Sequence, residues 1–371
     1  MSEHYPIAVV GAGLGGLVVA RVLRVNGVEA AVFEVEASAG VRGQGGMLDI
    51  HEESGQVALR AAGLYAEFRA LVHPGGEALR VVDKWGRLRL AEEDDGTGGR
   101  PEVDRGQLRD LLLGSLAGDT VHWGRKVVAV KSIGDGVHEV GFADGTSITT
   151  DLLIGADGAW SRVRPLLSGA VPAYTGISFI EVDLLDADER HPGSAALIGP
   201  GSFMCLGDGK GFLAHRESDG SLHVYVALPA TVDWLAGVTD PEVIKAAALA
   251  RFDGWADELR ALIVEADGGV AHRLIHALPV GHRWAAKAGV TLVGDAAHLM
   301  SPFAGEGANL AMLDGAELAL AVAGGVALAE YERELFARSE VAAAESAANL
   351  EMMFGVDGLD RLLGMFAGGQ P

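Results

Sequence analysis

The 371-residue chain is 49% hydrophobic, enough to fill the cores of two domains or of one large domain with a second inserted into it. Its formal net charge of −22, without any Lys- or Arg-rich run, argues against nucleic acid as a partner. The single cysteine, Cys205, leaves no internal disulfide and no cysteine-built metal site, as in proteins of a reducing compartment. The first residues lack the features of a signal peptide, and no apolar run reaches the roughly 18 residues of a membrane helix, so we expect a cytoplasmic protein without membrane contact.

The chain begins with a pattern of strand, turn and helix. An apolar run, a glycine-rich turn and apolar residues at helical spacing follow one another over residues 6–23, and a second apolar run, 29–33, ends at Glu34. The turn places three glycines at the spacing of a dinucleotide site: Gly11, Gly13 and Gly16. These glycines permit a tight turn, close approach of a pyrophosphate to the helix N-terminus and contact of helix with strand, while the acid accepts hydrogen bonds from a ribose. The pattern predicts dinucleotide binding in preference to a purely structural βαβ unit.

A glycine-rich loop follows, and it contains Arg42 and Asp49. Ser54 is the predicted N-cap of the next helix. The stretch "HEESG" resembles the start of a zinc protease motif, but Gly55 stands where the second His is required. The pair in "HRLIH", at positions 272 and 276, has a spacing that suits one helical face, yet no third ligand is evident, and we interpret both as surface histidines. No metal site is predicted.

Two arginines follow a predicted helix cap at Asp104. Arg105 and Arg109 lie one turn apart on the same side of the helix, an arrangement that suits an anionic ligand. The alternative is a solvated face on which Asp110 is the partner. Beyond this helix, apolar and polar residues alternate around the turns "GDG" and "ADG" over residues 126–158, which predicts a small β-meander.

Two further motifs follow apolar strand runs. In "DLLIGADGAWSRVR" the run ends at Asp157 and Gly158, and "GDAAHLMSPFAGEGAN", residues 294–309, joins an Asp to small residues, a Pro and three glycines. They resemble the Asp-Gly and Gly-Asp motifs of the FAD-dependent aromatic hydroxylases, the group A flavoprotein monooxygenases. Together with the first turn, the motifs stand in the order of that family and at about its spacings. The resemblance implies an α/β fold: a Rossmann-like FAD-binding domain of the para-hydroxybenzoate hydroxylase type, with an inserted antiparallel β-sheet substrate domain and a C-terminal bridging helix.

Within that family, "GQGGMLDIH", "EVDRGQLRDLLLGSL", "TVHWGRKV" and "GDAAHLMSPFAGEGAN" are similar to the tetracycline-inactivating flavin monooxygenases. The resemblance implies a contact with the nicotinamide cofactor at Arg42. It also implies that the Asp295 carboxylate accepts hydrogen bonds from the ribityl hydroxyls of FAD, and that the helix beginning near Gly305 points its N–H groups at the flavin. The predicted FAD contacts are Gly11, Gly13, Gly16, Glu34, Asp49, Arg105, Arg109, Asp157, Asp295, Gly307 and Asn309.

The segment 171–275 reads as an antiparallel sheet over the flavin, because the short runs "GISFIEVDLL", "AALIG", "SFMCLG", "KGFLAHR" and "SLHVYVALP" are separated by turn residues. The resemblance makes His223 a substrate contact, whereas the alternation alone makes it a surface residue. Glu181 replaces an amide of the tetracycline enzymes, "GPGSF" lacks their arginine, and Val35 replaces an arginine expected after the nucleotide acid. The predicted substrate contacts are Glu181, Phe203, His223, Pro302, Phe303, Gly305 and Met352.

A long helix is predicted from Leu328, since the segment is rich in helix formers and has no internal Gly or Pro until Gly355. In the family such a helix braces the two domains, so Met352 near its end either walls the pocket or packs in the core. We expect an FAD-binding domain of residues 1–72, 100–170 and 276–325, a substrate domain of 73–99 and 171–275, and a C-terminal bridging helix within 326–371.

The resemblance implies a monooxygenase in which NADPH reduces bound FAD and one atom of O2 passes to an electron-rich polycyclic phenol or enol. A tetracycline-type compound, inactivated by hydroxylation, is one candidate substrate, and another natural-product aromatic is the alternative. FAD supplies the chemistry, so no dedicated catalytic residue is expected. The sequence has no second glycine-rich βαβ unit, which fits transient binding of NADPH. We expect a monomer whose partner is the small aromatic substrate.

Three alternatives share the cofactor fold. A flavin halogenase is disfavoured because the sequence has no Trp-x-Trp-x-Ile-Pro stretch. An FAD-dependent reductase or dehydrogenase would carry the same three motifs. A protein that binds FAD and sequesters a ligand would not oxidise NADPH in response to substrate. Function resides in the pocket, so the fold does not decide among them.

Overall fold

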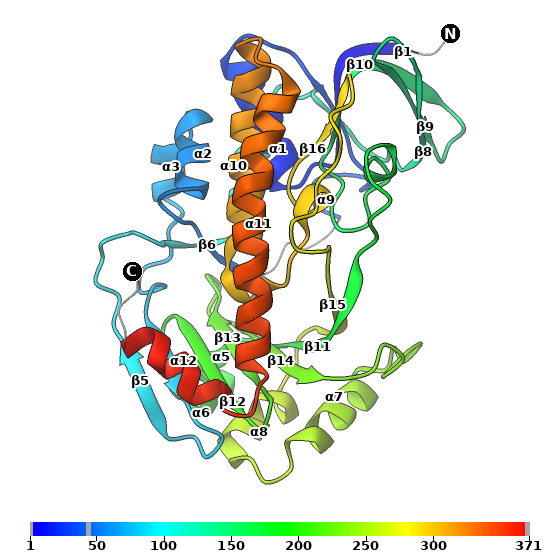
Figure 1. Ribbon diagram of the computed structural model, residues 1–371. Helices are drawn as coiled ribbons and strands as arrows, with labels where there is room; N and C mark the ends of the chain where they lie inside the picture. Colours follow the sequence, from blue (N-terminus) through cyan, green and yellow to red (C-terminus); the bar gives the residue numbers. More distant parts are fainter. Residues whose placement is uncertain (1–2, 42–45, 368–371) are drawn as a thin grey trace.

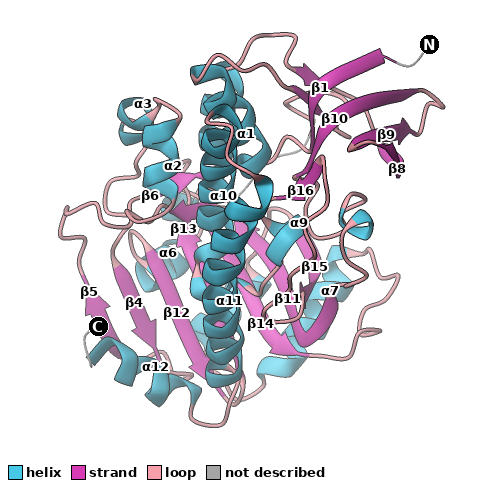
Figure 2. Ribbon diagram, turned by 45° about the horizontal axis from the view of Figure 1, so that its top comes forward, coloured by secondary structure: helices cyan, strands magenta, loops and turns pink. Residues whose placement is uncertain are grey.

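The computed structural model describes residues 3–41 and 46–367, and two sheets organise it (Figure 1). The first sheet lies in the upper part of the view, together with α1, α2, α3 and most of α10 and α11. The second sheet lies in the lower part, with α5 to α8 and α12 around it. One long helix, α11 (Leu328–Met353), extends from the upper part to the lower in both views (Figures 1 and 2).

The first sheet is mixed, and its central strands are parallel. β1 pairs in parallel with β2 and β10, and β16 pairs in parallel with β10. The predicted β-meander is confirmed, because β9 pairs antiparallel with β10 and β8 pairs antiparallel with β9. The strand order is β7 (Val121–His122), β2 (Ala31–Phe33), β1 (Glu3–Val10), β10 (Ser147–Gly155), β9 (Val137–Phe142) and β8 (Val127–Gly134), with β16 (Val290–Leu292) beside β10.

The helices α1 (Leu14–Val25) and α10 (Glu306–Ala323) pack closely against each other at small residues. A Cβ at Gly15 would lie 2.8 Å from the carbonyl oxygen of Ala311, and one at Gly315 would lie 2.6 Å from the carbonyl oxygen of Gly15. Neither position has room for a side chain. The crossing brings the N-terminal βα unit against the helix that follows the Gly-Asp motif.

The second sheet is antiparallel except where β12 pairs in parallel with β4. One face is covered by α6 (Pro192–Ile198), α7 (Pro241–Leu249) and α8 (Asp257–Val264), which share a buried apolar core with the strands. The strand order is β15 (Val270–Ala277), β11 (Ala173–Leu184), β14 (Leu222–Pro229), β13 (Lys210–Arg216), β12 (Ser202–Gly207), β4 (Leu79–Val82) and β5 (Leu88–Glu92).

The predicted strand at "AALIG" is wrong, because these residues belong to α6. Pro192 occupies the first turn, where its fixed φ favours a helix, and Ala195 and Ile198, three residues apart, are buried on one side. Four apolar or small residues do not distinguish a strand from one helical turn. The predicted helix after Ser54 is present as α2 (Gly55–Ala61), but the Ser54 hydroxyl makes no capping hydrogen bond.

The C-terminal part of the chain, up to residue 367, consists of two helices. The predicted long helix is confirmed as α11, and a further helix, α12 (Gly358–Ala367), follows it. A Cβ at Gly358 would lie 2.3 Å from the carbonyl oxygen of Met353, so a glycine is needed where the chain turns between the two helices. Within residues 3–41 and 46–367, no helix has the length and apolarity to span a bilayer. The other short elements are β3 (Met47–Asp49), α3 (Tyr65–Arg69), β6 (Glu102–Asp104), α4 (Arg105–Gly114), α5 (Ala187–Arg190) and α9 (Asp295–His298).

Candidate active site

The three sequence motifs meet at one edge of the first sheet. The glycine-rich turn, Asp157 and Asp295 each follow the carboxyl end of a strand, and those strands, β1, β10 and β16, are parallel neighbours. Ligands of open α/β sheets bind outside this edge. Segments far apart in the chain are therefore placed at one candidate binding region.

The glycine-rich turn has one open position and two tight ones. Gly11 has φ +106°, and a Cβ there would lie 2.3 Å from the carbonyl oxygen of Ala156, while a Cβ at Gly16 would lie 2.1 Å from that of Gly11. A Cβ at Gly13 would meet no atom of residues 3–41 and 46–367 within 4 Å. Gly13 is the N-cap of α1, so the free space lies at a helix N-terminus, where an anion is favoured.

The Glu34 carboxylate is buried beside this turn. Its Oε2 accepts a hydrogen bond from the backbone N–H of Ala12 at 2.6 Å, and its Oε1 accepts one from Glu36 N at 3.0 Å. Arg109 supports the same turn from α4: it donates to the carbonyl oxygens of Ala12 and Ala39 and pairs with Glu36 at 3.1 Å. Its guanidinium is thus bonded to protein, which differs from both sequence interpretations, a free FAD contact and a solvated face with Asp110.

The Asp157 carboxylate closes its own turn. It accepts hydrogen bonds from the Ser161 hydroxyl and the Arg162 N–H, both at 2.6 Å. Arg164, in the same motif, is buried and donates to the carbonyl oxygen of Ala296 at 3.1 Å. The Asp-Gly motif therefore supports the backbone of the Gly-Asp motif.

The Asp295 carboxylate is free of such bonds. Among the described residues its side chain makes no hydrogen bond, and it retains solvent exposure. Burial raises the pKa of the Asp295 carboxyl, although the charges of His298, Arg105 and Arg164 act in the opposite direction. The Arg105 side chain is exposed at the start of α4, and its charge acts on Asp295 and on Tyr225. An unpartnered carboxylate and an arginine thus lie near each other at this edge.

A buried histidine links β3 to the start of α10. Both ring nitrogens of His51 are paired, Nε2 with Asp49 at 2.8 Å and Nδ1 with Glu306 at 3.2 Å. Burial works against protonation, but the hydrogen bonds with the two carboxylates outweigh it and raise the pKa of His51 to about 9. His51, Glu53 and Glu306 are close enough to hold a cation, but an imidazolium with both nitrogens engaged offers no lone pair to a metal. The group acts as a set of ion pairs.

Asn309, in α10, connects this helix to β3 and to His51 through hydrogen bonds. Its amide donates to the carbonyl oxygen of Asp49 at 2.8 Å, and its Oδ1 accepts from the backbone N–H of His51 at 3.0 Å. The side chain is fully buried and its polar atoms are engaged in these bonds, so it joins β3 to the start of α10. The contact of Asn309 with FAD stays a prediction. A Cβ at Gly307 would meet nothing within 4 Å, whereas one at Gly305 would lie 3.3 Å from Asp49. Arg42, the predicted nicotinamide contact, lies outside the described residues.

The face of the second sheet opposite α6–α8 carries aromatic and polar side chains. Phe303 packs edge-on against Phe179 and Phe354, with ring centroids 5.8 and 5.2 Å apart. His223 lies on this face and pairs through Nδ1 with Asp183 at 2.5 Å. Glu181 accepts a hydrogen bond from Arg273 at 3.1 Å on the same face.

Among the other predicted substrate contacts, Phe203 does not face the candidate pocket. Its side chain is 1% exposed and packs in the core between the sheet and α6–α8, so it lies on the face away from Phe303. Met352 is half-buried at the end of α11 and packs in one apolar cluster with Phe303. Pro302 is exposed beside Phe303.

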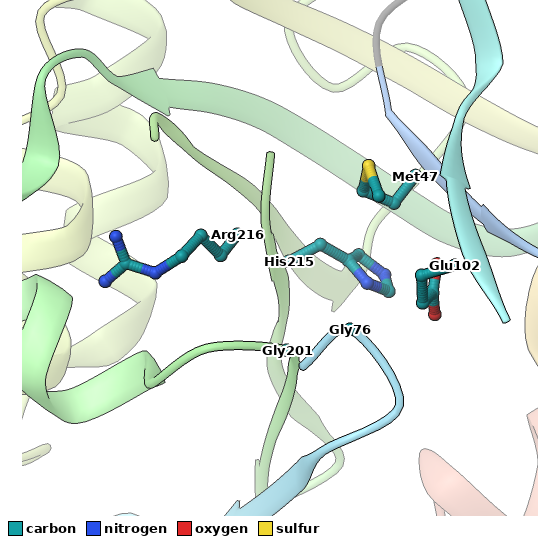
Figure 3. Close-up of a pocket in the computed structure, with 6 residues that line it drawn as sticks. All are labelled: Met47, Gly76, Glu102, Gly201, His215 and Arg216. Atoms are coloured by element: carbon teal, nitrogen blue, oxygen red, sulfur yellow. The ribbon is translucent and has the colours of Figure 1, made fainter. Parts of the chain in front are cut away.

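Sequence reasoning missed a group of buried polar residues beside the site. Figure 3 shows the His215 ring directed toward Glu102, with Met47 beside them and Arg216 pointing away. Burial lowers the pKa of His215 to about 4 and raises that of Glu217 to about 7. One carboxyl oxygen of Glu102 and one of Glu217 lack a hydrogen-bond partner among the described residues. Met47 and Glu102 come from chain segments far from residues 215–217, so no local spacing indicated the group.

Comparison with known proteins identifies the family. The model of an FAD-binding domain matches residues 4–335. The chain belongs to the group A flavin-dependent monooxygenases. Monooxygenase penA of Penicillium thymicola is 33% identical over 368 residues, covering 86% of this chain and 84% of penA. The FAD-dependent urate hydroxylase of Klebsiella pneumoniae is 31% identical over 326 residues, covering 82% of this chain and 78% of the hydroxylase.

Solved structures of this monooxygenase family share the fold. HpxO of Klebsiella pneumoniae, complexed with FAD and uric acid, superposes with a TM-score of 0.80 at 23% identity, covering 97% of this chain and 91% of HpxO. Tetracycline destructase Tet(51) superposes with a TM-score of 0.73 at 20% identity, covering 98% and 96%. The predicted fold class, a para-hydroxybenzoate hydroxylase-like α/β fold with an antiparallel substrate sheet, is confirmed. FAD as the cofactor and monooxygenation as the activity are also confirmed. The tetracycline destructase is one of several proteins with a similar structure.

Proposed function

We propose that this monooxygenase uses NADPH and O2 to hydroxylate a planar, electron-rich polycyclic phenol or enol. The observation that carries the proposal is a row of rings along one sheet face. Phe303 packs on Phe179, Phe179 packs on Tyr225, and Tyr225 packs on a histidine, His223, that is held by a carboxylate. Aromatic rings suit a flat apolar substrate, and the imidazole supplies a directed hydrogen bond. A tetracycline-type compound is one member of this substrate class.

The site residues fit FAD. Open space at Gly13, the N-cap of α1, suits the pyrophosphate, and Glu34 lies at the end of β2 beside this turn, where a ribose hydroxyl is expected. Asp295, without a hydrogen-bond partner among the described residues, accepts from the ribityl chain in this proposal, and the exposed Arg105 faces the same region. Bound FAD supplies the redox chemistry, and the protein binds, orients and excludes water.

The protein's own contribution to the reaction is orientation of the substrate. Asp183 holds Nδ1 of His223, which directs Nε2 toward the hydroxyl or carbonyl oxygen of the substrate. Burial disfavours the charged ring, but the hydrogen bond and charge of Asp183 outweigh burial and raise the pKa of His223. An imidazolium at this position favours a phenolate or enolate, whose ring carbons are more electron-rich. We assign NADPH as the electron donor, with Arg42 as the cation for its phosphate.

A panel assay tests this proposal. NADPH consumption is measured with tetracyclines, other polycyclic phenols and small monocyclic acids, and products are analysed by mass spectrometry for a gain of one oxygen atom. Oxygen insertion into a polycyclic member is expected. His223→Ala should slow substrate-stimulated oxidation about 2- to 150-fold, corresponding to one hydrogen bond of about 0.5–3 kcal/mol, without loss of FAD. Reduced products without added oxygen would instead support a reductase, and tight coupling only with monocyclic acids would refute the substrate class.

A further inference from the structure

We infer that Asp314 positions the Asp295 carboxylate for FAD by bonding both ends of the short helix that carries it. The inference rests on the proposed role of Asp295 as the ribityl-binding residue. Asp314 itself lies in α10, is fully buried and contributes no atom to the candidate cofactor surface. It is therefore a positioning residue.

A single carboxylate oxygen makes both contacts. Asp314 Oδ2 accepts a hydrogen bond from the backbone N–H of Gly294 at 3.0 Å and one from Nε2 of His298 at 2.6 Å. Gly294 precedes Asp295, and His298 is the last residue of α9, the four-residue helix that begins at Asp295. A helix this short has no stability of its own, so these bonds hold its shape.

Asp314 is itself fixed from α11. Its other oxygen, Oδ1, accepts from Nη2 of Arg338 at 2.9 Å, and Arg338 also pairs with Glu317 at 2.9 Å. Burial raises the pKa of the Asp314 carboxyl, but the charges of His298 and Arg338 outweigh burial and lower it. Asp314 is thus an ionised acceptor with three donors around it.

The histidine also acts on Asp295 through its charge. Burial works against a charged His298, yet Asp314 outweighs burial and raises the pKa of the ring. The resulting imidazolium is bonded to Asp314, and its charge favours the ionised form of Asp295. An ionised carboxylate accepts hydrogen bonds from hydroxyl groups more strongly than a protonated one.

The turn before α9 lies close to α10, with no room for a side chain at Gly294. Gly294 has φ +59°, and a Cβ there would lie 2.9 Å from the Cβ of Ala311, one turn of α10 before Asp314. The backbone of the turn therefore packs directly on the helix that carries its acceptor. Replacing the acceptor changes the anchor of Asp295 without touching the surface that faces the cofactor.

The test compares FAD with ADP, which shares the nucleotide part of FAD but lacks the ribityl chain and the flavin. Dissociation constants for both are measured on the full-length chain after removal of bound flavin. Asp314→Asn should raise the Kd for FAD about tenfold or more and leave the Kd for ADP within about twofold. A general loosening of the domain would weaken both ligands alike, and that result would overturn the inference.

Two controls sharpen the comparison. Glu332→Gln alters another buried carboxylate of the same domain, which accepts from Trp284 and Thr291 and does not contact the Asp295 turn, so FAD binding should not change. His298→Gln keeps a donor near the position of Nε2 and should bind FAD better than His298→Ala. These histidine variants carry the test if Asp314→Asn does not fold.

The possible results distinguish the positioning role of Asp314 from the proposed role of Asp295 in binding FAD. A wild-type chain that does not bind FAD, or an Asp295→Ala variant that binds it normally, refutes the proposed role of Asp295. Weak binding by Asp295→Ala with unchanged FAD binding by both Asp314→Asn and His298→Ala refutes the positioning role alone.

Discussion

At the scale of single residues, the contrast between Asp295 and the other predicted FAD contacts is the most informative. Glu34, Asp157 and Asn309 are engaged in hydrogen bonds within the protein, whereas the Asp295 side chain has none among the described residues. Because the Asp295 side chain is exposed and unpaired, its carboxylate can accept hydrogen bonds from a ligand without giving up a bond within the protein. Asp295 is therefore the position at which FAD binding is most sensitive to substitution.

Replacement of this carboxylate gives the first prediction. Asp295→Ala should lose charge-assisted hydrogen bonds worth about 1.5–3 kcal/mol and bind FAD about 10- to 150-fold more weakly. The ratio of flavin to protein absorbance in the purified variant measures the loss. Full occupancy of the variant would remove Asp295 from the cofactor site.

His51 gives a prediction about pH. Its pKa is about 9 in the folded protein and about 6.5 in an unfolded chain, so the stabilisation from its ion pairs is complete below pH 6.5 and is lost as the pH rises through 9. Across that window the free energy of unfolding should fall by up to about 3 kcal/mol. Urea unfolding of the wild type and of His51→Gln at pH 6.5, 8 and 9.5 measures this effect.

The comparison between the two proteins isolates His51 from other groups that titrate in the same range, such as Glu217. His51→Gln should be the less stable protein at pH 6.5, and the difference should shrink toward pH 9.5. A difference that stays constant with pH would show that the ring is not charged in the folded protein.

At the scale of elements, the crossing of α1 and α10 depends on two glycines. Gly315→Ala places a methyl group within 2.6 Å of the Gly15 carbonyl oxygen, so the helices must separate, at a cost of about 1–3 kcal/mol. Gly364→Ala, in α12, is the matched control because nothing lies within 4 Å of its Cβ position, and a small gain of up to about 1 kcal/mol is expected there. Denaturant unfolding of both variants checks the pair. Equal stabilities would mean that the crossing tolerates a larger separation.

Elements that carry a local signal could be predicted from the sequence. The glycine spacing indicated β1, the turn and α1, and the absence of Gly and Pro indicated α11. The error at Phe203 has a general cause: both faces of β12 are covered, so alternation does not reveal which face meets the pocket. Two contacts of the site could not be predicted, the one between His51 and Glu306 and the one between Gly294 and Asp314. In each, the two residues are far apart in the sequence and become neighbours only in the folded chain.

At the scale of the whole molecule, FAD is expected to contact segments from the N-terminal and the C-terminal parts of the chain. The predicted contacts come from the turn after β1, from β3, from α4 and from the turn after β16. A ligand that binds only the folded chain stabilises it by about 2.7 kcal/mol at 100 times its Kd, so saturating FAD should raise the melting temperature by about 5 °C or more. Calorimetry at several FAD concentrations tests this. A melting temperature independent of FAD would contradict binding across these segments.

The packing of α1 against α10 also has a consequence for folding during synthesis, because the two helices are far apart in the chain. α1 leaves the ribosome early, but α10, which packs against it, begins about 280 residues later, and five strands of the second sheet, β11 to β15, separate β10 from β16. At a translation rate of about 5–20 residues per second, the nascent βα unit waits roughly 15–60 s for its packing partner. During that interval a chain rich in Val and Leu presents an uncovered surface, so yield in a cell is expected to depend on chaperones that hold nascent chains. A circular permutant that begins before β16 would place α10 ahead of α1 in the order of synthesis and shorten this exposure.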